Sequence, residues 1–141
     1  MEAEVFLDTS YAIALAAASD QLHAKAIDLS EQLQAEATRL VTTQAVLLEI
    51  GNALAKQRYR SAAVKMLAAL EADPMVTLIS LTEELYRKAF RLYQDRPDKE
   101  WGLIDCVSFV VMSERGLSEA LTADEHFEQA GFKALLRVTS P

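Results

Sequence analysis

The sequence predicts an α/β fold, a three-layer α/β/α sandwich with a central, mostly parallel sheet of about five strands. Short apolar segments of strand-forming residues alternate along the chain with longer segments of helical periodicity. The strand segments are largely apolar rather than alternating, which is typical of a parallel sheet that helices cover on both faces. Only four Gly and three Pro occur in 141 residues, too few for a turn-dense all-β protein.

The expected strands are short. The first, residues 5–7, ends at Asp8, Thr9 and Ser10, which are residue types that cap helix N-termini. The last, residues 135–138, is expected at an edge of the sheet. The five strands begin near Val5, Leu40, Val76, Ala120 and Leu136.

Helices are expected between these strands. Thr43 and Thr82 are expected to begin helices, Asp73-Pro74 breaks the chain, and Gly116 ends a helix. The expected helices cover residues 11–18, 21–37, 44–57, 61–72, 82–94, 103–114 and 124–130.

Length and composition fit a single domain over residues 1–141, because single domains most often have about 100–150 residues. Apolar residues make up 51% of the chain and charged residues 25%, which excludes a disordered or collagen-like chain. The 14 Lys and Arg against 21 Asp and Glu give a formal net charge of −7. Binding of nucleic acid would therefore need a local basic patch or a bound metal rather than a positive overall field.

A cytoplasmic location without membrane association is expected. Cys106 is the single cysteine, so no intrachain disulfide can form, which suits a reducing compartment. The first ten residues, MEAEVFLDTS, lack the basic start of a secretory signal. The longest apolar run, residues 11–18, is far below the ~20 residues that span a bilayer.

Four acidic residues stand in or directly after apolar segments. Asp8 and Asp124 follow strands, whereas Glu49 and Asp105 interrupt apolar helices near their starts. No Lys or Arg is interleaved in these segments to pair with them. Because an unpaired buried carboxylate is strongly unfavourable, such groups are usually paired, protonated or bound to a metal.

All four carboxylates are expected at one edge of the sheet, because ligand sites of open parallel α/β sheets lie beyond the carboxyl ends of the strands. Oxygen ligands of this kind suit Mg²⁺ or Mn²⁺. Such an ion orients an attacking water and stabilises the charge of an in-line phosphoryl displacement.

Each acid also has a purely structural interpretation, and these stay open. Asp8 and Asp124 fit helix N-caps, and Asp105 fits a first-turn acid favoured by the helix dipole. Glu49 fits a solvated position on a helix surface. If all four structural interpretations were correct, each of the four acids would interrupt an apolar run by coincidence.

The four acids lie in the segments VFLDTSYAIAL (5–15), LLEIGNAL (47–54), WGLIDCVSFVVM (101–112) and LTADEHFEQAGF (121–132). In this order and spacing they resemble the PIN-domain nucleases, and especially the VapC-like toxin ribonucleases of type II toxin–antitoxin systems. The segment DQLHAKA (20–26) also looks like the early second helix of that family. The resemblance covers nearly the whole chain.

The resemblance implies an endoribonuclease that uses Mg²⁺ or Mn²⁺. A metal-activated water would cleave the RNA phosphodiester and leave a 5′-phosphate and a 3′-hydroxyl. Asp8 and Asp105 would bind the principal ion, Glu49 would help to orient the water, and Asp124 would support a second ion. Four polar neighbours would support the site: Thr9, Ser10, Asn52 and Thr122.

The implied partners are an RNA substrate, a second copy of the chain, and a small antitoxin protein that presents an Arg or Lys to the acidic pocket. The apolar helices over residues 44–72 are the expected interface with the second copy or with the antitoxin. Tyr59, Met66 and Leu67 of this segment fit the core equally well. Two basic clusters, within residues 56–65 and 87–99, are either solvated faces or guides for phosphate.

Other functions fit the sequence less well. A stand-alone PIN-domain nuclease of RNA processing and a catalytically silent scaffold are the alternatives. A phosphoacceptor receiver domain needs an acidic pair after the first strand and an Asp after the third, but the chain has the lone Asp8 and Leu81-Thr82 there. A phosphatase with an aspartyl nucleophile needs a second acid where Ser10 stands.

The remaining reactive side chains are interpreted structurally. His23 and His126 are too far apart, and without cysteine partners, for a zinc site. His126 is interpreted as a surface histidine on a short helix, with a place near the mouth of the pocket, two residues after Asp124, as the alternative. Cys106 is interpreted as a small core residue. Trp101 is interpreted as a packing anchor, with a base-stacking platform as the alternative.

Overall fold

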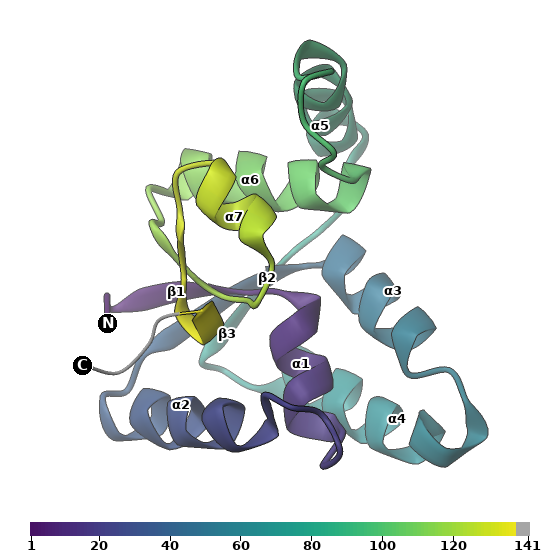
Figure 1. Ribbon diagram of the computed structural model, residues 1–141, viewed down its shortest axis with the longest axis vertical. Coiled ribbons are helices and arrows are strands. Elements are labelled where there is room, and N and C mark those ends of the chain that lie inside the picture. Colours follow the sequence, from purple (N-terminus) through teal and green to yellow (C-terminus); the bar gives the residue numbers. More distant parts are fainter. Residues whose placement is uncertain (138–141) are drawn as a thin grey trace.

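A five-stranded sheet forms the centre of the protein, whose computed structural model describes residues 1–137 (Figure 1). The strand order is β3-β2-β1-β4-β5, and every neighbouring pair is parallel. The prediction of a parallel sheet of about five strands is therefore confirmed. The strands are β1 (Glu4–Leu7), β2 (Arg39–Thr43), β3 (Val76–Ile79), β4 (Glu119–Leu121) and β5 (Lys133–Ala134).

Helices cover both faces of this sheet, which makes it the middle layer of a sandwich. In Figure 1, α1, α2 and α4 lie on one side of the strands, and α6 and α7 lie on the other. α5 packs against α6, and α3 contacts both α1 and α6. The helices are α1 (Thr9–Ala16), α2 (His23–Ala35), α3 (Gln44–Ala53), α4 (Gln57–Ala72), α5 (Glu83–Asp95), α6 (Leu103–Arg115) and α7 (Glu125–Gln129).

Three of the expected helix ends are confirmed by their hydrogen bonds or backbone angles. Thr43 Oγ1 accepts a hydrogen bond from the Val46 N–H at 3.2 Å, and Thr82 Oγ1 accepts one from the Leu85 N–H at 3.1 Å. Each bond satisfies a donor that the helix itself leaves free. Gly116 ends α6 with a φ of 67°, a conformation that glycine adopts without strain.

The fifth strand differs from its prediction. Pairing with β4 involves Lys133–Ala134, and Leu135–Arg137 form a 3-10 helix instead of a strand. Val138 lies outside the described residues. Leu135 and Leu136 are nevertheless buried, so their apolar character reflects packing and not strand pairing.

Three helix starts also differ, the first being that of α1, which begins at Thr9 rather than at residue 11. α4 begins at Gln57 rather than at residue 61, so part of the basic cluster is helical. α2 begins at His23 rather than at residue 21, because Asp20 Oδ1 accepts a hydrogen bond from the Leu22 N–H at 2.8 Å. This local turn holds the chain out of the helix for two residues.

Aromatic rings fill the core between the sheet and α6 and α7. Phe109 packs edge to face against Trp101, with 5.0 Å between ring centroids, and against Phe127, with 4.9 Å. Trp101 is 6% exposed, and its Nε1–H donates a hydrogen bond to Gln129 Oε1 at 3.0 Å. It is therefore the expected packing anchor, and it links the start of α6 to the end of α7.

Cys106 lies in this core, as expected. Burial, with a smaller effect of the nearby Asp105 charge, raises the pKa of its thiol to about 11. The thiol therefore stays protonated at neutral pH and is a poor nucleophile. On the opposite face of the sheet, Tyr59, Met66 and Leu67 are half-buried and pack against the core.

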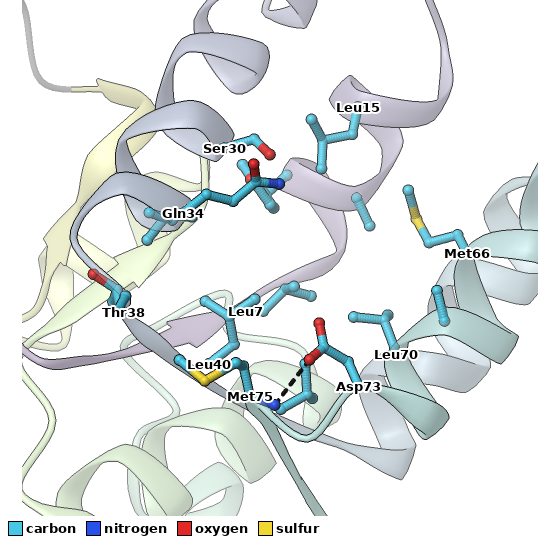
Figure 2. Close-up of a pocket in the computed structure, with 16 residues that line it drawn as sticks. Leu7, Leu15, Ser30, Gln34, Thr38, Leu40, Met66, Leu70, Asp73 and Met75 are labelled. Atoms are coloured by element: carbon cyan, nitrogen blue, oxygen red, sulfur yellow. Dashed lines mark hydrogen bonds between the residues drawn. The ribbon is translucent and has the colours of Figure 1, made fainter.

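A cavity of about 540 Å³ opens between α2 and α4 (Figure 2). Its lining is mostly apolar and also includes residues of α1 and the starts of β2 and β3. Asp73 lies at its border, where Oδ1 accepts a hydrogen bond from the Met75 N–H at 2.8 Å. None of the four predicted acids lines it. Within residues 1–137, no helix is long and apolar enough to cross a membrane.

Candidate metal centre

The predicted acids lie around the carboxyl ends of β1 and β4. Asp8 directly follows β1, and Asp124 comes shortly after β4, which pairs with β1. The chain passes from β1 to β2 on one side of β1, whereas β4 lies on the other side. The site is therefore at the point where the strand order reverses, which is where ligand crevices form in open α/β sheets.

Asp8 is the most buried of the four acids, with 5% of its surface exposed. It stands at the N-cap position of α1, but its side chain does not cap that helix. Instead, Asp8 Oδ2 accepts a hydrogen bond from Thr122 Oγ1 at 2.7 Å, and the carboxylate accepts another from the Thr9 N–H. The interpretation of Asp8 as a simple helix cap is therefore wrong.

Burial raises the pKa of Asp8 to about 6. The hydrogen bonds from Thr122 and from the Thr9 N–H lower the pKa, and the charges of Asp105 and Glu49 raise it. Among residues 1–137, no Lys or Arg forms an ion pair with any of the four acids. Asp8 is thus a buried carboxyl whose charge would be stabilised by a cation.

Two hydroxyl groups connect the start of α1 to the loop that follows β4. Thr122 Oγ1 accepts a hydrogen bond from the Asp124 N–H at 3.0 Å, and Ser10 Oγ accepts one from the Ala123 N–H at 2.9 Å. The two hydroxyl oxygens are 3.2 Å apart. Ser10 Oγ also lies 3.4 Å from Asp8 Oδ2, so its hydroxyl proton can go to Asp8 or to Thr122. The network fixes Asp124 relative to Asp8.

Glu49 is half-buried on α3 and is joined to the site through Thr9. Thr9 Oγ1 donates a hydrogen bond to Glu49 Oε1. Thr9 therefore contacts two of the acids, Glu49 through its hydroxyl group and Asp8 through its backbone N–H. Asn52, on the same helix, is exposed, and its side chain forms no hydrogen bond with the rest of residues 1–137. Its supporting role stays a prediction that no contact favours.

Asp105 lies in the first turn of α6 and contacts both the helix start and the site. Its Oδ2 accepts a hydrogen bond from the Gly102 N–H at 3.1 Å and is 3.1 Å from His126 Nδ1. Burial raises the pKa of Asp105, and the charge of Asp124 raises it further. The hydrogen bond from Gly102 and the interactions with His126 lower it. Asp105 therefore supports the helix start and also faces the other acids.

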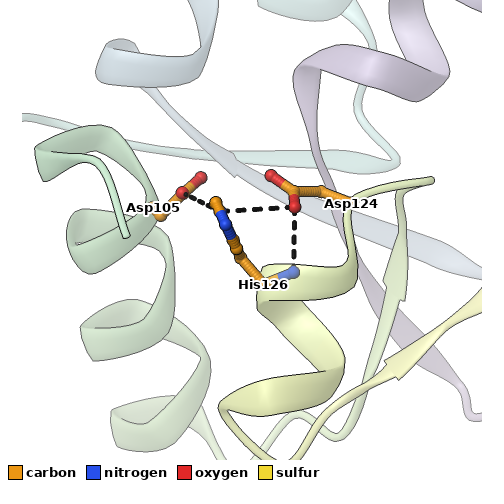
Figure 3. A group of neighbouring side chains, drawn as sticks. All are labelled: Asp105, Asp124 and His126. Carbon is orange, nitrogen blue, oxygen red and sulfur yellow. Dashed lines mark hydrogen bonds and ion pairs between the residues drawn. The ribbon is translucent and has the colours of Figure 1, made fainter. Parts of the chain in front are cut away.

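Asp124 and His126 complete the group, and Figure 3 shows the imidazole between two carboxylates. Asp124 Oδ1 accepts a hydrogen bond from the His126 N–H at 2.8 Å and lies 3.4 Å from His126 Nδ1. One ligand atom from each of Asp105, Asp124 and His126 lies within 4.8 Å of the others. Asp8 and Glu49 are outside this tight group, although their charges act on each other across the site.

His126 is not among the site residues predicted from the sequence, where a place near the pocket mouth was only the alternative to a surface histidine. The surface interpretation is wrong, because the side chain of His126 is only 25% exposed and faces Asp105 and Asp124. The sequence feature that points to this location is the position of His126, two residues after Asp124 on a helix that Asp124 caps. Capping holds the first turn of that helix close to the acid, so a side chain there can turn back towards the site.

The donor set fits a divalent cation. Carboxylate oxygens are the preferred ligands of Mg²⁺ and Mn²⁺, and the absence of paired Lys or Arg within residues 1–137 leaves their charge uncompensated. Asp105 and Asp124 are 18% and 34% exposed, so solvent reaches their carboxylates. The arrangement can hold an ion that remains open to a substrate.

Comparisons with known proteins show the family of the chain. The 23S rRNA-specific endonuclease VapC20 of Mycobacterium tuberculosis, from strains CDC 1551 and H37Rv, is 29% identical over 128 residues, which cover 91% of this chain and 95% of the relative. The crystal structure of the same M. tuberculosis protein, described as a sarcin-ricin loop cleaving toxin, matches with a TM-score of 0.79 at 29% identity and the same coverage. The PIN domain profile matches residues 5–133, and the chain belongs to the PIN domain family.

Proposed function

We propose that this protein is a metal-dependent endoribonuclease and the toxin of a type II toxin–antitoxin pair. The observation that carries the proposal is the gathering of Asp8, Glu49, Asp105 and Asp124 at one edge of the sheet without a paired Lys or Arg in residues 1–137. The similarity to a 23S rRNA-specific endonuclease supports ribosomal RNA as the substrate. Such a substrate would place the protein in the cytoplasm.

In this proposal Asp8 and Asp105 would hold a Mg²⁺ or Mn²⁺, and Glu49 would accept a hydrogen bond from the attacking water. The ion would supply an activated water and stabilise the charge that develops on the scissile phosphate. The Thr9 hydroxyl holds Glu49, and the Thr122 hydroxyl holds Asp8 and favours its charged form. The protein's own contribution is thus to orient charged oxygens before substrate arrives.

A cleavage assay tests this proposal. Purified protein is incubated with 23S rRNA and Mn²⁺ or Mg²⁺, and the product ends are mapped. We expect cleavage at a discrete position with a 5′-phosphate on the downstream fragment, loss of activity in EDTA, and recovery with excess Mn²⁺. Activity that survives EDTA would contradict the metal mechanism. Cleavage of many unrelated RNAs would favour a processing nuclease, and no cleavage of any RNA would favour a silent scaffold.

The proposed antitoxin has two complementary surfaces to bind. Its Arg or Lys would neutralise the acids, which lack a paired cation within residues 1–137. An apolar segment would fill the cavity between α2 and α4, into which Leu15, Met66 and Leu70 project (Figure 2). In the cleavage assay such a partner should inhibit, and a variant of it without that Arg or Lys should inhibit less.

A homodimer is the other proposed assembly, and α5 offers a surface for it. Tyr86, Phe90 and Tyr93 share one face of this helix and are 44%, 46% and 49% exposed. The rings of Tyr86 and Phe90 stack, with 6.3 Å between centroids. Leu48 on α3 is also exposed, at 64%. Exposed aromatic residues of this kind are typical anchors of protein interfaces.

Phe90→Glu should weaken this dimer at least about 10-fold, because a charge would replace an apolar anchor in the interface. Light scattering after size exclusion, over a range of protein concentrations, measures the change. Val64→Glu is the matched control, since Val64 is an exposed apolar residue of α4, at 59%. Dissociation by Val64→Glu and not by Phe90→Glu would place the interface on residues 44–72 instead.

A further inference from the structure

We propose that His126 is a direct nitrogen ligand of a metal ion that it shares with Asp105 and Asp124, at a position next to the one that Asp8 and Asp105 are proposed to hold. The centre would then be a mixed oxygen–nitrogen site that favours Mn²⁺ and later first-row ions over Mg²⁺. The proposal rests on the proposed metal-dependent function. It adds to the four acids a residue that the PIN-domain resemblance does not include.

The separations between the three side chains are those of ligands around one ion. His126 Nδ1 is 3.1 Å from Asp105 Oδ2 and 3.4 Å from Asp124 Oδ1. With metal–ligand bonds of ~2.1 Å, neighbouring ligand atoms are ~3.0 Å apart in an octahedral site and ~3.4 Å apart in a tetrahedral site. Both separations fit two ligands of one ion, and one ligand atom from each of the three residues lies within 4.8 Å of the others.

The position of α7, which carries His126, is set by contacts other than those with the acids. The next residue, Phe127, is fully buried and packs against Phe109 of α6. At the other end of α7, Gln129 accepts a hydrogen bond from Trp101, just before α6 begins. These contacts fix α7 against the start of α6, where Asp105 lies. The core thus places the backbone of His126 beside the start of α6, and its side chain contacts Asp105 and Asp124.

A purely structural role for His126 makes a different prediction. In that role the Nδ1–H of His126 donates a hydrogen bond to Asp105 Oδ2, and this bond only holds the carboxylate in place. As a ligand, Nδ1 offers its lone pair and the proton is on Nε2. His126→Asn separates the two roles, because the Asn amide can place an N–H donor near the position of Nδ1 but has no basic nitrogen to coordinate.

The test uses metal-free protein and Mn²⁺ alone, without RNA. Electron paramagnetic resonance counts the bound Mn²⁺, and spin-echo modulation detects a coordinated nitrogen, which labelling histidine with ¹⁵N assigns to that residue type. We expect a histidine coupling in the wild type and its loss in His126→Asn. The dissociation constant for Mn²⁺ should rise about 10-fold, and that for Mg²⁺, measured by competition, should change less than about 3-fold.

His23→Asn is the matched control, because His23 is the other histidine of the chain and its Nδ1 pairs with the backbone oxygen of Ala14. This variant should keep the histidine coupling and both affinities. Bound Mn²⁺ without a histidine coupling would overturn the proposal and leave the acidic metal site standing, as would an equal loss of Mn²⁺ and Mg²⁺ affinity in His126→Asn. A wild-type protein that binds no Mn²⁺ would overturn both this inference and the proposed function.

Discussion

Asp8→Asn should stabilise the metal-free protein by up to about 3 kcal/mol at pH 7–8, although it removes an acid of the proposed active site. Burial raises the pKa of Asp8 from 3.8 to about 6. The native protein therefore holds this proton more tightly than the unfolded chain does. A pKa that is 3.8 in the unfolded chain and about 6 in the native protein lowers the free energy of unfolding by about 3 kcal/mol once the carboxyl group is ionised. Asn carries no charge, and its amide oxygen can still accept the hydrogen bond from Thr122.

The sign of the effect follows from proton linkage. As the pH rises from about 4 to about 6, the unfolded chain has lost the Asp8 proton while the native protein still holds it, so the free energy of unfolding of the wild type falls. Above pH 6 the contribution of this group is constant and unfavourable. Asp8→Asn should lack this fall and should equal the wild type in stability below about pH 4.

Urea unfolding from pH 4 to pH 8 in EDTA measures the difference. Asp28→Asn, a change at an exposed Asp of α2, is the control and should alter the free energy of unfolding by less than about 0.5 kcal/mol at every pH. If Asp8→Asn were less stable than the wild type at pH 8, the buried carboxylate would not be a source of instability, and the interpretation of Asp8 would be wrong.

Asp105→Asn should lower the rate of RNA cleavage at least about 100-fold while the protein stays folded. The carboxylate is central to the site, since it contacts His126 and its pKa is raised by the charge of Asp124. The neutral amide is a far weaker ligand for a hard cation. Its oxygen can still accept the hydrogen bond from the Gly102 N–H, so the start of α6 should be preserved.

Single-turnover cleavage at saturating Mn²⁺ measures this loss, and circular dichroism checks the fold. Asp28→Asn serves again as the control and should cut at the wild-type rate. A folded Asp105→Asn protein that cuts within about 3-fold of the wild type would exclude Asp105 from the reaction.

The placement of the acids was predictable because topology and composition constrain it. Asp8 and Asp124 each follow a strand, and parallel strands end at one edge. What the sequence could not decide was whether such an acid caps a helix or faces a ligand, since the same residue type serves both. Asp8 turns to Thr122 and does not cap, whereas Asp124 both caps α7 and faces the site.

Other features depend on packing that local sequence does not encode. His126 reaches the site because Phe127 and Trp101 orient α7, and these contacts join residues distant in the chain. The apolar residues Leu135 and Leu136 predicted a strand, but they show only that this segment is buried. A 3-10 helix buries them as well as a strand would. The exposure of Asn52 follows from the rotation of α3 about its axis, which core packing sets.

The central claim is that these carboxylates hold the ion that cleaves RNA, and a paired titration tests it most directly. The rate of cleavage and the fraction of protein with bound Mn²⁺ are measured on the same samples over the same range of Mn²⁺ concentrations. We predict that the two curves have the same midpoint in the wild type and that Asp105→Asn weakens both together. Full cleavage at Mn²⁺ concentrations that leave the site empty would contradict the account.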